Sequence, residues 1–335
     1  MVLPDTQFYS QLHPDTYVGQ PQWIKDRAAA DGIRYKYAYS NAAVCAVARN
    51  TLILGRYACS TGNHNMRSRY PVPEHFRTYP SLDKQIGDWL KELDDEGARD
   101  NTIVFYHSDH GGIPPRAKRY INDTGTHVPL IARFPKKWQH LAPAEAGTVS
   151  DRPVAFIDLP PTVFSLAGVE IPGQFQGHAF AGKAAVEKEP YVFLFGQRFD
   201  SRMLRFVRAV TDGEYRYIRN FHPHRHRGIL AGYPHGQVSW QSLLKLKQAG
   251  KLNDVQSAYW TIPQPVEELY HTAQDPWELN NLVNAPKHQD RLARMRDAAL
   301  NKMREIGDTG LVPEAMYEGI LSLSKRSMSR RPSAS

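Results

Sequence analysis

A cysteine and an arginine lie one helical turn apart at the start of an apolar run. Cys45 is followed by Arg49, and the run continues to Leu54. We expect Cys45 at a strand-to-helix turn, where the amino end of a helix stabilises negative charge. An anion-binding nucleophile would be well placed there, and Arg49 would point at the same spot. Alternatively, Cys45 is a small buried apolar residue and Arg49 forms a surface salt bridge.

A second group of polar residues follows a short predicted strand. The run 101–107 is apolar, β-branched and aromatic, which predicts a buried strand. Ser108, Asp109 and His110 come next, and the carboxyl end of a parallel strand is where α/β sheets place ligands. The alternative is a strand-end turn capped by the aspartate. Further on, Lys118 offers a point charge for an anionic oxygen, or is a solvated surface lysine.

The segment from Cys45 to Gly55 resembles the signature of the sulfatase family, which reads Cys-x-Pro/Ala-x-Arg before an apolar pair and Thr-Gly. Val47 stands where the family has proline or alanine, and Leu54 where it has threonine. The resemblance implies that a formylglycine-generating maturation enzyme oxidises Cys45 to formylglycine, whose hydrate is the nucleophile. Arg49 would hold that hydrate.

The residues after the predicted strand resemble the same family and the wider alkaline-phosphatase-like superfamily. By that resemblance Asp109 and His110 are metal ligands, and the expected cation is calcium (Ca²⁺). Lys118 matches the sulfate-binding lysine, which together with Cys45 and Arg49 completes the expected catalytic set. His127 replaces the family's arginine, so an anion contact there would be weaker and pH-dependent. Another possibility within the same superfamily is a phosphatase or phosphodiesterase. Those enzymes use a serine or threonine nucleophile and usually two metals.

The resemblance extends over most of the chain and implies its fold. The stretches 156–168 and 268–282 are similar to C-terminal segments of heparan N-sulfatase-like and related bacterial sulfatases. We therefore expect an α/β fold, an alkaline-phosphatase-like sandwich with a mainly parallel central sheet and a smaller C-terminal α+β subdomain. The expected divisions are a catalytic core over 1–180, the subdomain over 181–320, and a disordered basic tail over 321–335.

Local patterns predict several elements of that fold. Ile86, Trp89, Leu90 and Leu93 recur at helical spacing, so 82–96 is expected to be an amphipathic helix with these residues in the core. Asp-Gly between two apolar runs predicts a hairpin over 208–218. Further helices are expected over 23–30, 239–249 and 286–303, and a strand over 33–39.

Two parts of the family pattern are missing from the sequence. The chain opens without the strand and paired aspartates that supply half of the family's metal site, and Leu82 runs directly into the helix before the metal-binding strand. We interpret this as a missing N-terminal strand and an internal deletion near 82/83. One aspartate and one histidine are few ligands for calcium, which takes about six to eight oxygens. The alternative to an active sulfatase is therefore a truncated, catalytically impaired relative that at most binds sulfated ligands.

The composition indicates which kinds of molecule the protein is expected to bind. The formal net charge of +8 suits an anionic substrate such as a sulfated small molecule or glycan. We expect no nucleic-acid partner, and no stretch of the sequence is apolar enough for a membrane span. The N-terminus resembles no signal peptide, and localisation is left open. Cys45 and Cys59 are too few for a disulfide framework, although a bridge between them is possible.

The segment 222–227 alternates histidine with proline and arginine. Its His-x-His-x-His spacing could line a zinc site. The proline and the lack of a nearby acidic or cysteine partner argue against that. His222 and His224 could instead contact acidic groups of a substrate, or the segment could be a solvated loop.

Overall fold

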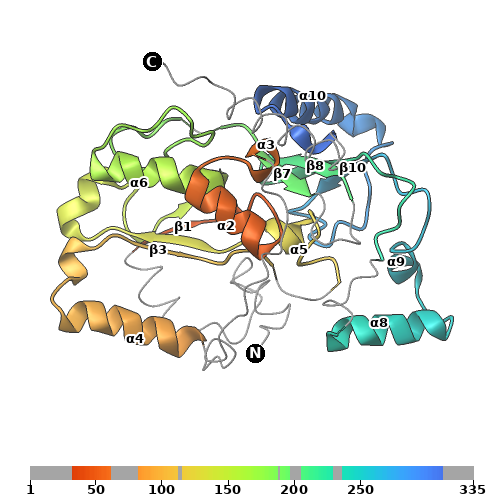
Figure 1. Cartoon of the computed structure of the whole chain (residues 1–335), viewed down its shortest axis with the longest axis horizontal. Helices are drawn as coiled ribbons and strands as arrows, with labels where there is room; N and C mark the ends of the chain where they lie inside the picture. Colours follow the sequence, from red (N-terminus) through yellow and green to blue (C-terminus); the bar gives the residue numbers. More distant parts are fainter. Residues whose placement is uncertain are drawn as a thin grey trace, which may run out of the picture.

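The computed structural model describes residues 32–61, 82–111, 115–187, 189–196, 205–228 and 236–311. Within them helices and strands are mixed along the chain, which confirms the α/β class (Figure 1). The strands are β1 (Gly32–Tyr35), β2 (Ala38–Tyr39), β3 (Val104–His107), β4 (Leu130–Arg133), β5 (Val149–Ser150), β6 (Val154–Ala155), β7 (Val192–Gly196), β8 (Val207–Thr211), β9 (Tyr215–Asn220) and β10 (Glu267–His271).

The described residues also form α-helices and short 3-10 helices. The α-helices are α2 (Cys45–Leu54), α3 (Ala58–Thr61), α4 (Leu82–Asp95), α5 (Asp123–Thr126), α6 (Leu159–Ala167), α8 (Val238–Gln248), α9 (Asp254–Ser257) and α10 (Gln289–Glu305). The 3-10 helices are η4 (Arg99–Asn101), η5 (Lys136–Leu141), η6 (Phe156–Asp158), η7 (Pro286–His288) and η8 (Thr309–Leu311). No helix in these described ranges is both long and apolar enough to span a membrane.

The first sheet has the strand order β3-β4-β1-β5. Strand β4 runs antiparallel to both of its neighbours, whereas β1 and β5 are parallel. The expectation of a mainly parallel sheet is therefore wrong for the described strands. A parallel neighbour needs a crossover, usually through a helix. In the described part of the connection between β3 and β4 the only helix is the short α5, and the two strands pair antiparallel.

The second sheet has the order β10-β9-β8-β7 and is antiparallel throughout. Strands β8 and β9 form the hairpin predicted at Asp212 and Gly213, and Gly213 takes the left-handed φ of 102° that this turn requires. Helix α10 packs over this sheet against β8 and β9 (Figure 1). Four of the six residues of β9 are buried, and Tyr215 and Arg219 are partly exposed.

The two sheets pack into different hydrophobic clusters. Tyr39 and Val47, which flank the start of α2, belong to the same buried cluster as Phe193 of β7 and Tyr217 of β9. A second cluster lies around β1 and β4 and includes Phe180. The segment that carries Cys45 is therefore packed against the C-terminal sheet.

Helix α4 confirms the predicted amphipathic helix, with one correction. Trp89 is 59% exposed, so the expectation that it lies in the core is wrong. It faces outward because the helix lies at one edge of the molecule, beside the first sheet (Figure 1). The helix expected over 23–30, the tail over 321–335 and the residues just before the 82/83 junction lie outside the described residues.

Candidate active site

Cys45 is the first residue of α2, and the turn before it is anchored on both sides. The Asn41 side chain is fully buried, donates to the Phe193 carbonyl at 2.9 Å and accepts from the Ile157 amide at 3.0 Å. The N-cap, Val44, offers no side-chain acceptor to the helix. The first amide groups of α2 are thus left for another acceptor, which is the condition for anion binding at a helix start.

The Cys45 thiol lies between a histidine and a lysine. Its Sγ is 3.0 Å from His110 Nε2 and 3.0 Å from Lys118 Nζ. Burial raises the pKa of the thiol, but His110 and Lys118 outweigh burial and lower that pKa to about 7. Cys45 is therefore not an inert core residue: the geometry favours the thiolate at neutral pH.

The ring of His110 is oriented by the backbone. Its Nδ1 lies 2.6 Å from the Gly111 carbonyl, which can only accept a hydrogen bond. Nδ1 therefore carries the proton, and Nε2 is the nitrogen that faces Cys45. A neutral His110 can then accept the thiol proton through Nε2, and a protonated one can donate to the thiolate.

Arg49 and Asp109 join this group. An Arg49 guanidinium nitrogen is 3.2 Å from Asp109 Oδ2, and the Arg49 side chain is 65% exposed. The other Asp109 oxygen lies 3.8 Å from His110 Nε2. The expected catalytic and metal-ligating residues Cys45, Arg49, Asp109, His110 and Lys118 thus come together at one place, although they arise from separate segments of the chain.

Two glycines allow these segments to approach. The Gly111 amide donates to the Gly125 carbonyl at 3.0 Å, and a Cβ on Gly111 would lie 1.8 Å from the Thr124 carbonyl oxygen. A Cβ on Gly125 would lie 2.2 Å from the Tyr120 carbonyl oxygen. Any larger residue would push His110 away from the segment that carries Lys118.

The same residues are the candidate metal ligands. Ligand atoms of Cys45, Asp109 and His110 lie within 4.8 Å of one another, the one such cluster among the described residues. A carboxylate oxygen and an imidazole nitrogen suit a divalent cation. They fit as one side of a coordination sphere, because calcium requires more oxygen ligands than this pair supplies.

His127 is 8% exposed and has both ring nitrogens engaged. Nδ1 lies 3.0 Å from Asp123 Oδ2 and Nε2 lies 2.8 Å from the Lys36 carbonyl. The ring also lies 5.0 Å from that of Tyr39. This environment gives His127 a packing role, and its contact with a substrate stays a prediction.

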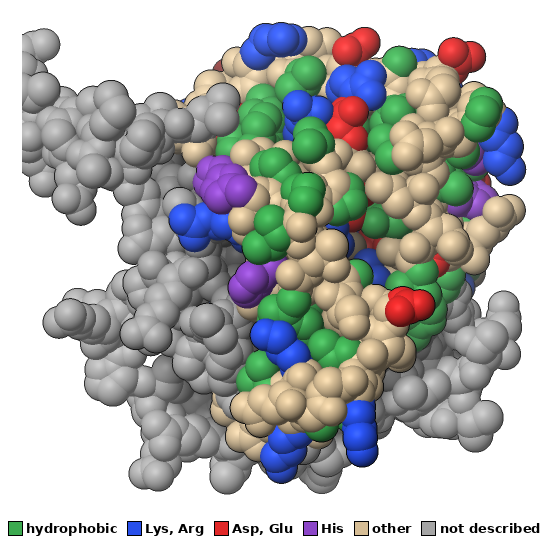
Figure 2. Space-filling view, turned by 90° about the vertical axis from the view of Figure 1, so that its right-hand side faces the viewer, with side chains coloured by type: hydrophobic (Ala, Val, Ile, Leu, Met, Phe, Trp, Pro, Cys, Tyr) green, Lys and Arg blue, Asp and Glu red, His purple; other side chains and the backbone are tan. Residues whose placement is uncertain are grey.

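The histidine-rich loop lies beside the C-terminal sheet. The rings of His222 and His224 are 5.4 Å apart, and His222 also contacts Phe206. These histidines are not part of the Cys45 cluster, so a direct substrate contact by His222 or His224 stays a prediction. Figure 2 shows that one face of the molecule carries Lys, Arg and His side chains among apolar ones.

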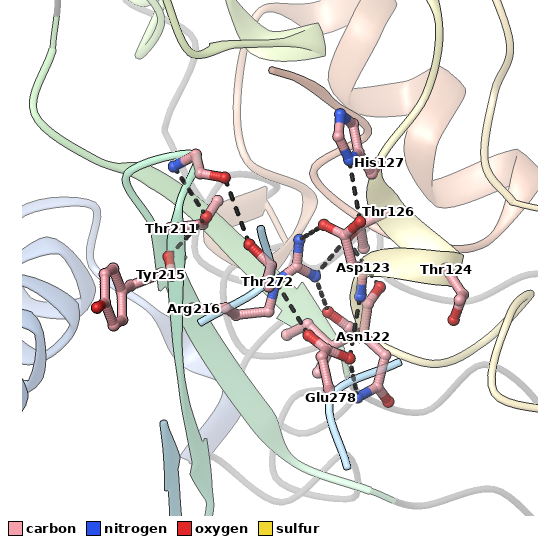
Figure 3. Close-up of polar contacts among 12 residues, drawn as sticks. Asn122, Asp123, Thr124, Thr126, His127, Thr211, Tyr215, Arg216, Thr272 and Glu278 are labelled. Carbon is pink, nitrogen blue, oxygen red and sulfur yellow. Dashed lines mark hydrogen bonds and ion pairs between the residues drawn. The ribbon is translucent and has the colours of Figure 1, made fainter. Parts of the chain in front are cut away.

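Sequence reasoning missed the charged residues that hold the segment around Lys118. Arg216 of β9 is fully buried, and Glu278 is 3% exposed (Figure 3). An arginine within a strand that is otherwise buried needs a buried carboxylate, and this signal could have directed attention to Arg216. Cys59 is a free, fully buried thiol, as expected of a structural cysteine, and burial raises its pKa to about 12.

The structure is that of an α/β protein in which a thiol lies between a histidine and a lysine, and comparison with known proteins identifies its family. The sulfatase family model matches residues 59–169. An ulvan-active sulfatase of Formosa agariphila is 37% identical over 234 residues, which are 70% of this chain and 38% of that protein. The human N-sulphoglucosamine sulphohydrolase is 26% identical over 279 residues, 76% of this chain and 52% of the enzyme.

The chain belongs to the sulfatase family. It spans about two fifths to one half of the length of these relatives. Among solved structures, one protein in complex with its substrate D-glucosamine-2-N,6-O-disulfate is 20% identical, with a TM-score of 0.47 over 68% of this chain and 39% of the other.

Proposed function

We propose that this chain is the part of a sulfuric ester hydrolase that carries the nucleophile, and that its substrates are sulfate esters or sulfamates of glycans. The observation that supports this most is the position of Cys45 Sγ, 3.0 Å from both His110 and Lys118 at the start of α2. The names of the relatives, an ulvan-active sulfatase and an N-sulphoglucosamine sulphohydrolase, support a sulfated glycan as the substrate class.

In this proposal Cys45 is the residue that a maturation enzyme converts to formylglycine, which when present supplies the nucleophilic oxygen. Lys118 Nζ, already within 3.0 Å of Sγ, would balance negative charge on the sulfuryl oxygens. His110 Nε2 faces the same position and, because Nδ1 donates to the Gly111 carbonyl, would be the nitrogen available to a cation. The amide groups at the start of α2 would add to the stabilisation of the anion.

Asp109 and His110 would hold a divalent cation, expected to be calcium, which would supply charge neutralisation to the bound sulfate. Arg49 keeps the Asp109 carboxylate oriented and prevents it from repelling an anionic substrate. Cation binding should raise the melting temperature of the protein by mass action. Asp109→Asn should abolish that shift, whereas an equal shift in the variant would remove Asp109 from the cation site.

The activity is tested by sulfate release from a panel of sulfated polysaccharides after co-expression with a formylglycine-generating enzyme. The proposal predicts release by the wild-type chain and none by Cys45→Ala. A second candidate is an impaired relative that binds sulfated glycans without turnover, which the small number of cation ligands in the described residues favours. Binding of a sulfated polysaccharide with no release by the fully converted protein would support this second candidate.

A further inference from the structure

The segment from Arg116 to His127, here called the Lys118 segment, is held by two buried charged residues of the C-terminal half (Figure 3). Arg216 of β9 donates to the Ile121 carbonyl at 2.6 Å and to the Asp123 carboxylate at 2.7 Å. It also donates to the Thr126 hydroxyl at 2.7 Å. One planar guanidinium thus fixes three points of the segment.

Glu278 holds the same segment through Asn122, Asp123 and Arg116. Its Oε2 accepts from the Asn122 side chain at 2.6 Å and from the Asp123 amide at 3.2 Å. Arg116 donates to the Glu278 carboxylate at 3.4 Å and to its backbone carbonyl at 3.2 Å. Glu278 is in turn 3.4 Å from Arg216 Nε, so the two residues form one network.

The backbone around Lys118 needs such support. Arg116 and Arg119, two residues before Lys118 and one after it, have left-handed φ values of 73° and 79°. This conformation costs roughly 1–2 kcal/mol for a residue with a Cβ. It persists only where the surroundings hold it in place. The Arg119 amide also donates to the Ala43 carbonyl at 2.7 Å, directly before the turn into α2.

We propose that Arg216 and Glu278 are positioning residues that set the distance between Lys118 Nζ and the side chain at position 45. Their contacts with this part of the site are to Arg116 and residues 121–126, so they act through the Lys118 segment. The C-terminal sheet would therefore help to build the active site rather than only cover it. The importance of this distance for catalysis rests on the proposed function. The distance itself, between Lys118 and Cys45, can be tested without any activity.

The test uses the unconverted protein with EDTA present, so that it requires neither maturation nor activity. The rate of Cys45 alkylation by iodoacetamide at a fixed neutral pH reports the cation beside the thiol, because the thiolate is the reactive form. Lys118→Met should slow alkylation by roughly three- to tenfold. Arg216→Lys keeps the charge but loses the planar fork, and should slow it by a similar factor.

Two further variants separate positioning from general stability. Arg208 of the neighbouring strand β8 is equally buried but pairs with Asp308, so Arg208→Lys should lower the melting temperature and leave the alkylation rate unchanged. Because Arg216 acts through Lys118, the double variant Lys118→Met/Arg216→Lys should react at the rate of Lys118→Met alone.

The proposal is overturned if folded Arg216→Lys reacts at the wild-type rate, or if its effect persists undiminished when Lys118 is absent. Should Arg216→Lys not fold, Glu278→Gln takes its place, since it keeps an acceptor for Asn122 but loses the charge facing Arg116 and Arg216. An inactive enzyme with the predicted alkylation pattern would count against the proposed sulfatase activity and leave this inference standing.

Discussion

Lys118 Nζ donates to Cys45 Sγ at 3.0 Å although the two residues are 73 positions apart in the chain. The contact requires the start of α2 and the Lys118 segment to be brought side by side. Backbone hydrogen bonds do this, from the Ser40 amide to the Thr126 carbonyl at 2.8 Å and from the Val128 amide to the Ala38 carbonyl at 2.9 Å.

The two cysteines should differ sharply in reactivity. In the unconverted, metal-free protein, Cys45 has a thiol pKa of about 7, whereas burial raises the pKa of Cys59 to about 12. Iodoacetamide should therefore label Cys45 alone below pH 8 or so in the native state. Mass spectrometry of peptides after digestion measures the label at each site. Equal labelling of both thiols would contradict the cationic environment assigned to Cys45.

Gly111→Ala should disrupt the site more than its small size suggests. The new Cβ would lie 1.8 Å from the Thr124 carbonyl oxygen. Because that oxygen belongs to the backbone, no side chain can move aside, and the end of β3 must separate from the Lys118 segment. Overpacking of this kind typically costs about 1–3 kcal/mol in the free energy of unfolding. Denaturant unfolding measures that loss. Gly173→Ala, where nothing lies within 4 Å of the added Cβ, is the matched control and should be near neutral.

The fold could be predicted in outline because the chain's strongest patterns are local. The Asp212-Gly213 turn and the amphipathic period of α4 each specify an element without help from distant residues. The direction of pairing between β3 and β4 could not be read in this way, since it depends on the path of the chain between them. The exposure of Trp89 likewise depends on where α4 lies in the molecule.

The residues of the candidate site could be predicted from the sequence, but the residues that hold them in position could not. Cys45, Asp109 and Lys118 stand out through their types and their resemblance to a family pattern. Arg216 lies 93 residues beyond Asp123 and Glu278 lies 156 residues beyond Asn122, so only the folded chain shows that they converge on the Lys118 segment. The engagement of His127 by Asp123 and the Lys36 carbonyl is a tertiary effect of the same kind.

Asp308→Ala should be among the most destabilising changes at the C-terminal end. Asp308 accepts a two-pronged hydrogen bond from Arg208, and both side chains are almost fully buried. Removing the carboxylate leaves a buried charge without its counter-ion, which costs about 3–5 kcal/mol. Asp95→Ala, which breaks the exposed pair with Lys91, should cost far less, because solvent screens that pair. Similar losses for the two variants in chemical denaturation would contradict this assignment.

Glu267 should contribute to acid sensitivity. Hydrogen bonds from Arg296, at 2.6 and 2.9 Å, are the main cause that lowers the pKa of this carboxyl below its ordinary value. A carboxyl with a lowered folded pKa stabilises the protein above its unfolded pKa of about 4.3, and this stabilisation is lost as the pH falls through the folded pKa. The melting temperature of Glu267→Gln should therefore fall less steeply than that of the wild type below about pH 4.3. Parallel curves for the two proteins would rule out the contribution.

The most direct test of the central claim is to measure the converted fraction of Cys45 and sulfate release in the same preparations. Peptide mass spectrometry gives the fraction of formylglycine after expression with different amounts of maturation enzyme. If Cys45 is the precursor of the nucleophile, the rate of sulfate release from a sulfated polysaccharide will rise in proportion to that fraction and extrapolate to zero at no conversion. Release that is independent of the converted fraction, or its absence at full conversion, would contradict the account.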